Sequence, residues 1–230
     1  MSADELPELL ESYATALGPD ADELIEEMGI QARREEFPYV GPAVGGWLAM
    51  CARFADAERV FEFGSGFGYS AYWFARELPE DGQVVLTERD ADELDQAREY
   101  LDRGGVADRA AFEHGDAIET VESYDGPFDV VLIDCQKERY AEAFEAVRDK
   151  VAPGGIVAAD NVVAGGTIDA GDLVAYFEDT NGDEGDLEEA EMNEMSRGIA
   201  AYLETVREDE AFETVLLPVG EGVAVSHCEW

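Results

Sequence analysis

The stretch that most constrains the fold is Phe128–Tyr140, with the sequence FDVVLIDCQKERY. Its centre, Val130–Ile133, is a run of four branched aliphatic residues, which is typical of a strand buried on both faces and so of a central strand in a parallel sheet. The run ends in Asp134, and Lys137 follows three residues later. Ligands of open α/β sheets bind beyond the carboxyl ends of the strands. We therefore expect Asp134 and Lys137 to lie at the rim of a site rather than in a core.

A second stretch, Gly154–Asn161 (GGIVAADN), repeats this design, because a short apolar strand ends in Asp160 and Asn161. If the two strands are neighbours, these two side chains and Asp134 bring three oxygen donors together. Carboxylate and amide oxygens are hard ligands, and neither histidine lies near these motifs, which favours Mg²⁺ over Zn²⁺. The sequence therefore predicts a divalent-cation site with Lys137 beside it as a base.

A glycine-rich turn, Gly64–Ser70 (GSGFGYS), separates a predicted strand, Arg59–Phe63, from a predicted helix, Ala71–Leu78. Such an elbow binds nucleotides or anions, and its glycines let the backbone approach a ligand closely. The dinucleotide pattern G-x-G-x-x-G needs glycine where Tyr69 stands, which weakens the case for a nicotinamide cofactor. Glu62 is a carboxylate in an otherwise apolar strand, so we expect it to have a partner, such as a cationic group of a ligand.

Two further acids follow predicted strands. Glu88 ends the strand Gln83–Glu88 and stands 20 residues after Gly68, where an acid accepts hydrogen bonds from ribose hydroxyls. A solvated acid at the strand end is the alternative, and the glycine turn favours the ribose role. Asp116 follows the strand Ala110–Glu113 and could cap the next helix, hydrogen-bond an adenine amino group, or do both.

The alternation of strands and helices predicts one α/β domain over residues 1–230, with a doubly wound, Rossmann-like and mostly parallel sheet of about seven strands. Residues 1–54 are predicted to form a helical cover. Val40 and Gly41 either belong to that cover, which the local sequence favours, or form one wall of a cofactor site. The acidic segment 178–194 is predicted to be mobile surface, with a lid over the site as the minor alternative. The remaining predicted helices and strands span 91–101, 138–151, 198–207, 212–217 and 222–227, and the last two strands form an antiparallel pair.

Composition indicates the setting. The net charge is −40, yet 46% of the residues are hydrophobic, so the chain is not an acidic disordered tail. The sequence holds only two lysines, Lys137 and Lys150, and a lysine-poor acidic surface is typical of cytoplasmic proteins of halophilic, high-salt organisms. Three widely spaced cysteines indicate reduced thiols, and neither a signal core nor an apolar run long enough for a membrane span is present. We expect a soluble cytoplasmic protein without a membrane partner.

Taken together, VFEFGSGFGYS, the strand ends at Glu88 and Asp134, LIDCQKERY and AADN resemble the cation-dependent class I O-methyltransferases, which include the catechol and caffeoyl-CoA O-methyltransferase-like enzymes. The likeness covers roughly residues 38–228, and the spacing D-x-x-K-x-R-Y is its most specific part. It implies S-adenosyl-L-methionine as methyl donor and Mg²⁺ or another divalent cation as cofactor. The implied metal ligands are Asp134, Asp160 and Asn161, and the implied general base is Lys137.

The resemblance also implies where the methyl donor binds. The methionine part would contact Glu62, Gly64 and Ser70, with backbone contacts from Val40 and Gly41; the ribose would contact Glu88, and the adenine would contact Asp116 and Ala117. The other implied cofactor-binding residues are Ser65, Gly66 and Asp134. Cys135 and Gln136 replace bulkier residues that are common beside the adenine in the animal catechol enzymes. The segment 178–194 has no clear counterpart, so the acceptor pocket does not transfer. Relatives commonly pair, which implies a possible homodimer.

The leading hypothesis is therefore O-methylation of a small catechol-like or vicinal-dihydroxy acceptor. The first alternative is methylation of a hydroxylated uridine in tRNA, although a charge of −40 without a basic stripe argues against nucleic acid at ordinary salt. A nicotinamide-dependent oxidoreductase and a non-catalytic acidic binding protein rank lower.

Overall fold

Alternate residues along the central strands pack into two separate hydrophobic clusters, one on each face of a single sheet. In β4 (Phe128–Ile133), Val130 and Leu132 join the first cluster, and Val131 and Ile133 join the second. Side chains of a strand alternate between its two faces, so the stretch that is covered on both sides, Val130–Ile133, is apolar throughout. The prediction of a central, fully buried strand is confirmed.

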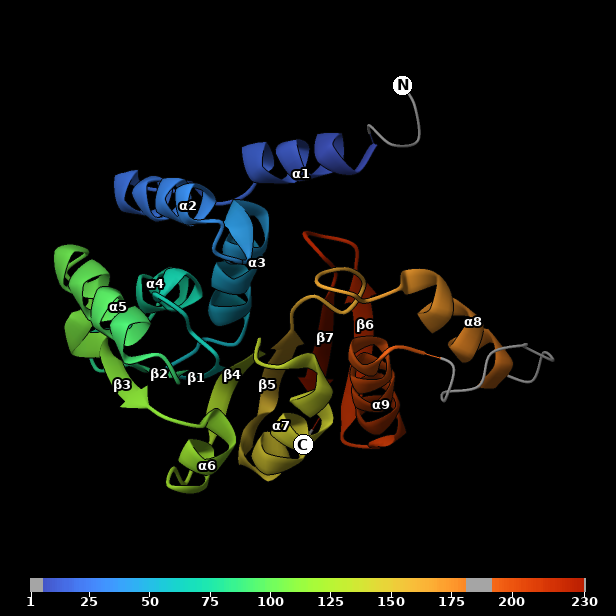
Figure 1. Cartoon of the computed structure of the whole chain (residues 1–230). Helices are drawn as coiled ribbons and strands as arrows, with labels where there is room; N and C mark the ends of the chain where they lie inside the picture. Colours follow the sequence, from blue (N-terminus) through green and yellow to red (C-terminus); the bar gives the residue numbers. More distant parts are fainter. Residues whose placement is uncertain (1–5, 181–191, 230) are drawn as a thin grey trace.

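The structure is a computed structural model that describes residues 6–180 and 192–229. The strands of this part form one seven-stranded sheet in the order β3-β2-β1-β4-β5-β7-β6 (Figure 1). Neighbouring strands are parallel from β3 to β5, whereas β7 runs antiparallel to both β5 and β6. The other strands are β1 (Arg59–Phe63), β2 (Gln83–Glu88), β3 (Ala110–His114), β5 (Val151–Ala159), β6 (Phe212–Leu217) and β7 (Val223–Cys228).

Helices cover both faces of the sheet (Figure 1). Side chains of α2 to α5 contribute to the first cluster, and those of α6, α7 and α9 contribute to the second. None of the helices in the described part is long and apolar enough to span a bilayer. The helices are α1 (Leu6–Leu17), α2 (Glu23–Glu35), α3 (Gly41–Phe54), α4 (Tyr69–Ala75), α5 (Ala91–Arg103), α6 (Ala117–Glu122), α7 (Tyr140–Val147), α8 (Ala170–Thr180) and α9 (Glu194–Glu208).

The order of the strands places the ligand site. From β1 the chain builds outward to β2 and β3, and it then returns to β4 and β5 on the other side of β1. A reversal of this kind opens a crevice at the carboxyl ends of the two central strands. The glycine turn follows β1 and Asp134 follows β4, so both lie at this crevice. The fold class predicted from the sequence is confirmed.

Several boundaries differ from the prediction. α4 begins at Tyr69 rather than Ala71, directly after Gly68 (φ 86°), and it ends at Ala75, three residues before Leu78, whose helical conformation Pro79 disfavours. α7 is shorter than the predicted 138–151 because single 3₁₀ turns precede and follow it.

Two regions lie beyond the expected elements. α8 was not predicted, and the acidic segment 178–194 begins within its last turn. Residues 181–191 of that segment lie outside the described part of the chain, so the prediction of a mobile loop stays untested there.

Candidate cofactor and cation site

The glycine turn after β1 packs tightly against the strand end that carries Asp134. A Cβ atom on Gly64, whose φ is 86°, would lie 2.4 Å from the carbonyl oxygen of Asp134, so only glycine fits there. The N–H of Gly66 donates to Glu88 Oε2 at 2.9 Å, and the N–H of Ser65 donates to the carbonyl of Thr87 at 3.0 Å. The ends of β1, β2 and β4 thereby form one floor, above which a cavity of about 550 Å³ opens.

Glu62 lies fully buried beneath this turn and does not itself line the cavity. The hydroxyl of Ser70 donates to its Oε1, whereas Oε2 has no hydrogen-bond partner in the described part of the chain. Burial, opposed by the hydrogen bond from Ser70 and assisted by the nearby carboxylates of Asp134 and Glu88, raises the pKa of Glu62 to about 8. A buried acid with one unsatisfied oxygen fits a cationic ligand group at this position.

Glu88 is held by the backbone around it. Besides the N–H of Gly66, its carboxylate accepts the N–H groups of Arg89 at 2.7 Å and Asp90 at 2.9 Å. These bonds fix the side chain at the edge of the cavity, where it is one of the lining residues.

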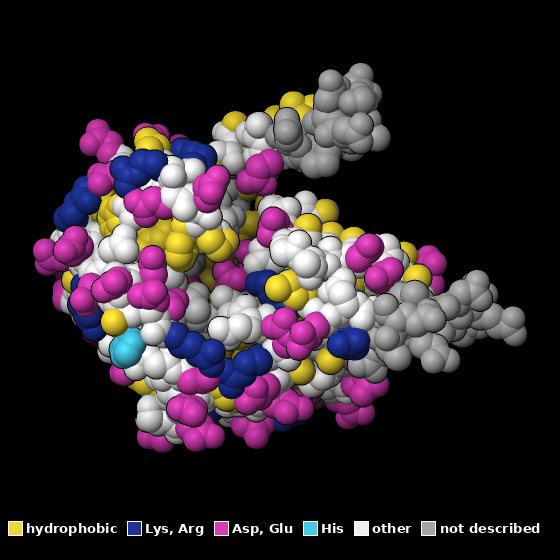
Figure 2. Space-filling model, in the orientation of Figure 1, with side chains coloured by type: hydrophobic (Ala, Val, Ile, Leu, Met, Phe, Trp, Pro, Cys, Tyr) yellow, Lys and Arg dark blue, Asp and Glu magenta, His cyan; other side chains and the backbone are white. Residues whose placement is uncertain are grey.

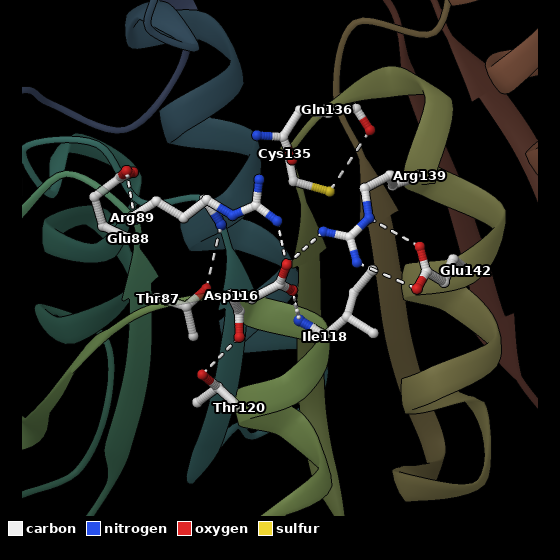
Figure 3. Close-up of polar contacts among 11 residues, drawn as sticks. Thr87, Glu88, Arg89, Asp116, Ile118, Thr120, Cys135, Gln136, Arg139 and Glu142 are labelled. Atoms are coloured by element: carbon white, nitrogen blue, oxygen red, sulfur yellow. Dashed lines mark hydrogen bonds and ion pairs between the residues drawn. The ribbon is translucent and has the colours of Figure 1, made fainter.

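Asp116 and Ala117 line a second cavity of about 270 Å³, which shares part of its wall with the first. Asp116 caps α6 by accepting the N–H of Ile118 at 2.9 Å, and its Oδ2 accepts the guanidiniums of Arg89 and of Arg139, the latter at 2.6 Å (Figure 3). Partial burial alone would raise the pKa of Asp116, but the hydrogen bonds from Arg139 and Arg89 lower it to about 2. The sequence predicted the cap and missed both arginines.

The predicted cation ligands converge after β4 and β5. The ammonium of Lys137 donates to Asp134 Oδ1 at 3.0 Å, to Asn161 Oδ1 at 2.6 Å and to the hydroxyl of Tyr140 at 2.5 Å. The Tyr140 hydroxyl in turn donates to the carbonyl of Asp160 at 2.9 Å. One oxygen from each of two predicted ligands therefore faces a single point, which the ammonium occupies in this structure.

Asp160 is the third predicted ligand and the most deeply buried, with an exposed fraction of 2%. Its Oδ1 has no hydrogen-bond partner among the described residues. Burial and the neighbouring charge of Asp134 raise its pKa to about 8. The described residues contain no group of three or more His, Cys, Asp and Glu side chains that could hold a metal ion. The predicted set consists of two acids and one amide. Two carboxylates, one of which has an unsatisfied buried oxygen, and one amide oxygen fit a hard divalent cation.

Glu221, which the sequence analysis missed, fixes the orientation of Asn161. The Asn161 amide nitrogen donates to Glu221 Oε2 at 2.6 Å, so the amide oxygen faces Lys137. Glu221 lies between β6 and β7, and its carbonyl accepts the N–H groups of Val163 at 3.0 Å and Ala164 at 2.9 Å. Its distance from Asn161 in the sequence explains why no local pattern revealed it.

Some of the remaining predicted residues line the first cavity and others do not. Val40, Gly64, Ser65, Gly66 and Ser70 line the first cavity, whereas Gly41 (φ 74°) begins α3 beside Val40 and lines neither cavity described above. The structure therefore brings the predicted site residues to one crevice, with Glu62 below it and Gly41 behind it.

Comparison with known proteins identifies the family. A family model described as O-methyltransferase matches residues 20–228. The chain belongs to this O-methyltransferase family. A catechol O-methyltransferase of Niastella koreensis is 34% identical over 133 residues, which cover 56% of this chain and 60% of the relative. A catechol O-methyltransferase of Mycobacterium tuberculosis is 36% identical over 125 residues, or 54% of this chain and 57% of the relative. The matched part therefore spans less than two thirds of these two relatives.

Solved structures show the same fold. An O-methyltransferase of Bacillus cereus in complex with SAH superposes with a TM-score of 0.78 at 22% identity, over 96% of this chain and 97% of the other. TomG of Streptomyces achromogenes, an O-methyltransferase solved with SAM, gives a TM-score of 0.79 at 24% identity over the full length of both chains. At such identities the likeness supports the Rossmann-like methyltransferase architecture.

Proposed function

We propose that the protein is an S-adenosylmethionine- and divalent-cation-dependent O-methyltransferase acting on a hydroxyl of a small catechol-like or vicinal-dihydroxy acceptor. The observation that carries this proposal is the convergence of Asp134 Oδ1 and Asn161 Oδ1 on the ammonium of Lys137, at 3.0 and 2.6 Å, beside the cavity above the glycine turn. Family membership supports methyl transfer to oxygen and argues against the oxidoreductase alternative.

The methyl donor would bind across the crevice. Glu62, with an unsatisfied buried oxygen, would attract the cationic amino group of the methionine part, and Ser70 would support it. Glu88 would accept the ribose hydroxyls. Val40, Gly41, Gly64, Ser65, Gly66 and Asp134 would surround the methionine part, and Asp116 and Ala117 would border the adenine.

A divalent cation would be held by Asp134, Asp160 and Asn161, and when bound it lowers the pKa of an acceptor hydroxyl beside it. The ammonium of Lys137 now uses two of these oxygens, so it would yield them to the cation and keep Tyr140 as a partner. Lys137 in its uncharged form would then remove the acceptor's proton. The cofactor would supply the methyl group from its sulfonium: the C–O bond to the acceptor would form as the C–S bond breaks, and the electron pair of the C–S bond would stay on sulfur.

The chain's residues mainly position the reactants. Methyl transfer from a sulfonium to an anionic oxygen cancels charge, so alignment in a water-poor cleft dominates. Cytoplasmic location, a single domain and a homodimer stay predictions.

The test is methyl transfer from labelled S-adenosylmethionine to catechol in molar KCl. Mg²⁺ should be required and EDTA should abolish transfer. Lys137→Ala should lower the rate by about 10²–10⁴-fold, the usual contribution of a general base. Lys150→Arg is the matched control, because Lys150 binds the carbonyls of Val121 and Tyr124 away from the site. Undiminished transfer by Lys137→Ala, or by wild type in EDTA, would refute the proposal.

A further inference from the structure

The charged residues that line the larger cavity are nearly all acidic. Within the described part of the chain they are Glu88, Asp134, Glu138, Asp160 and Glu221, against one cation, Lys137. Figure 2 shows acidic side chains over much of the visible surface, but a cavity is where charge selects a ligand, because it focuses the field of the side chains that line it.

Three of these acids already have a task in the proposed site. Glu88 accepts three backbone N–H groups, and Asp134 accepts the ammonium of Lys137. Asp160 is buried, and its Oδ1 has no hydrogen-bond partner among the described residues. The two others, Glu138 and Glu221, are exposed and form no ion pair within the described residues. Glu221 uses Oε2 for Asn161, while its Oε1 accepts no hydrogen bond from a described residue.

These two acids line the cavity beside the predicted cation site. Glu221 is joined directly to the ligand Asn161, and Glu138 follows Lys137 in the chain. The uncharged residues that line this cavity include Pro38, Gly166 and Met195. An acceptor whose hydroxyls reach the cation site would therefore place its other substituents near two unpaired carboxylates.

Arg89 and Arg139 line the adjoining smaller cavity, but both already bind Asp116. No lysine or arginine occurs in the sequence between Lys150 and Arg197, the stretch that supplies Asp160, Gly166 and Met195. Arg33 comes near through a 2.8 Å hydrogen bond to the Tyr39 hydroxyl, but it does not itself line the cavity.

We propose that the acceptor is a small catechol with an uncharged or protonated-amine substituent, and that Glu138 and Glu221 reject acceptors with several negative charges. This inference rests on the proposed function and deepens it. Like charges brought together across an interface suppress the wrong partner. Coenzyme A thioesters and nucleotides are thereby excluded, although some relatives are named caffeoyl-CoA O-methyltransferases.

The experiment compares kcat/KM for four probes at constant Mg²⁺: dopamine, catechol, protocatechuate and caffeoyl-CoA. The expected order is dopamine and catechol first, then protocatechuate, with caffeoyl-CoA at least about ten-fold below catechol. Added KCl should narrow the differences, because salt screens exposed charges. The ratio between probes is the readout, so a general loss of activity does not imitate the effect.

Glu138→Gln and Glu221→Gln should each narrow the ratio of catechol to caffeoyl-CoA by about three-fold, and the double variant by more. Glu99→Gln is the matched control, since it removes one exposed charge on α5 and should leave the ratio unchanged. If Glu221→Gln impairs folding, Glu138→Gln still decides the matter.

Each outcome has one meaning. Caffeoyl-CoA as the best substrate, or ratios that neither variant moves, would overturn this inference and leave the methyltransferase proposal standing. Absence of transfer to any catechol would overturn both.

Discussion

At the end of the crevice where the adenosine is proposed to bind, which we call the adenosine end, the Asp116 carboxylate accepts hydrogen bonds from the first turn of α6 and from two guanidiniums. At the cation end, Asp160 is almost completely buried and one of its oxygens has no described partner. The same side chain therefore has opposite acidity at the two ends, with a pKa of about 2 for Asp116 and about 8 for Asp160.

The contrast distinguishes a carboxylate that has its partners within the protein from two buried acids that lack some of theirs. Asp116 is stabilised by the protein itself, so its position does not depend on a ligand. Asp160 and Glu62 are costly to ionise in the folded chain, because burial removes them from water without supplying a full set of partners. A buried acid whose partner is missing indicates where a ligand supplies the missing charge.

The largest expected effect comes from Asp160→Asn. We expect Mn²⁺ affinity, measured by calorimetry, to fall at least about 100-fold, because even second-shell changes cost 10–100-fold. The metal-free variant should melt no lower than wild type, since the amide replaces a carboxyl group whose ionised form is destabilised by burial. Asp116→Asn serves as the control and should bind Mn²⁺ as wild type does. Normal Mn²⁺ binding by Asp160→Asn would remove Asp160 from the cation site.

The second-largest effect is expected for Glu62→Gln. Loss of a buried charge opposite a cationic ligand group should weaken S-adenosylmethionine binding by about 30-fold or more in calorimetry. Ser70→Ala, which keeps the carboxylate, should weaken binding less. Equal effects of the two variants would show that the charge of Glu62 does not act on the cofactor.

The pH dependence of stability tests the same residue without a ligand. Because the pKa of Glu62 is raised to about 8 from 4.5, the folded state holds more protons than the unfolded state between these values. Its contribution to stability therefore falls as pH rises from about 4.5 to 8. Thermal melts of ligand-free protein should show a shallower decline for Glu62→Gln than for wild type over this range, and parallel curves would contradict the raised pKa.

The positions of the strand-end residues could be predicted from the sequence, because the end of a buried strand fixes where the next side chain lies. Val130–Ile133 and the segment around Val157 are uniformly apolar, so their ends, and with them Asp134 and Asp160, are set by burial. The glycine turn was equally readable, since Gly64 leaves no room for a side chain. The fold class and the family followed from these elements and are confirmed.

The sequence could not supply residues that reach the site from elsewhere. Glu221 lies 60 residues from Asn161 and is brought there by the β6–β7 turn. Arg89 and Arg139 stand among other charged residues with no periodic signal, and only the folded chain shows that they meet at Asp116. α8 was not predicted, and only its last turn, from Glu178, belongs to the acidic segment that predicts solvated surface.

A smaller effect is expected at Asp116. Asp116→Asn keeps the helix cap but loses the charge that faces two guanidiniums, which should lower the free energy of unfolding by about 1–2 kcal/mol at neutral pH. Because the folded pKa is lowered to about 2, this stability is present above pH 3.8 and is lost as pH falls through about 2. Denaturant unfolding at pH 7 and pH 2 should show a difference between the two proteins at the first pH and little at the second.

The smallest effect distinguishes the two arginines. The Arg89 side chain is 49% exposed and pairs with Asp116 alone, whereas Arg139 is 28% exposed and also binds Glu142 at 2.8 Å. Arg89→Gln should therefore cost less than about 1 kcal/mol of stability, and Arg139→Gln should cost more. If Arg89→Gln proved the more damaging in urea unfolding, Asp116 would depend mainly on its exposed partner. The adenosine end would then be less independent of ligand than its geometry indicates, because an exposed guanidinium is the one a bound adenosine would cover or displace.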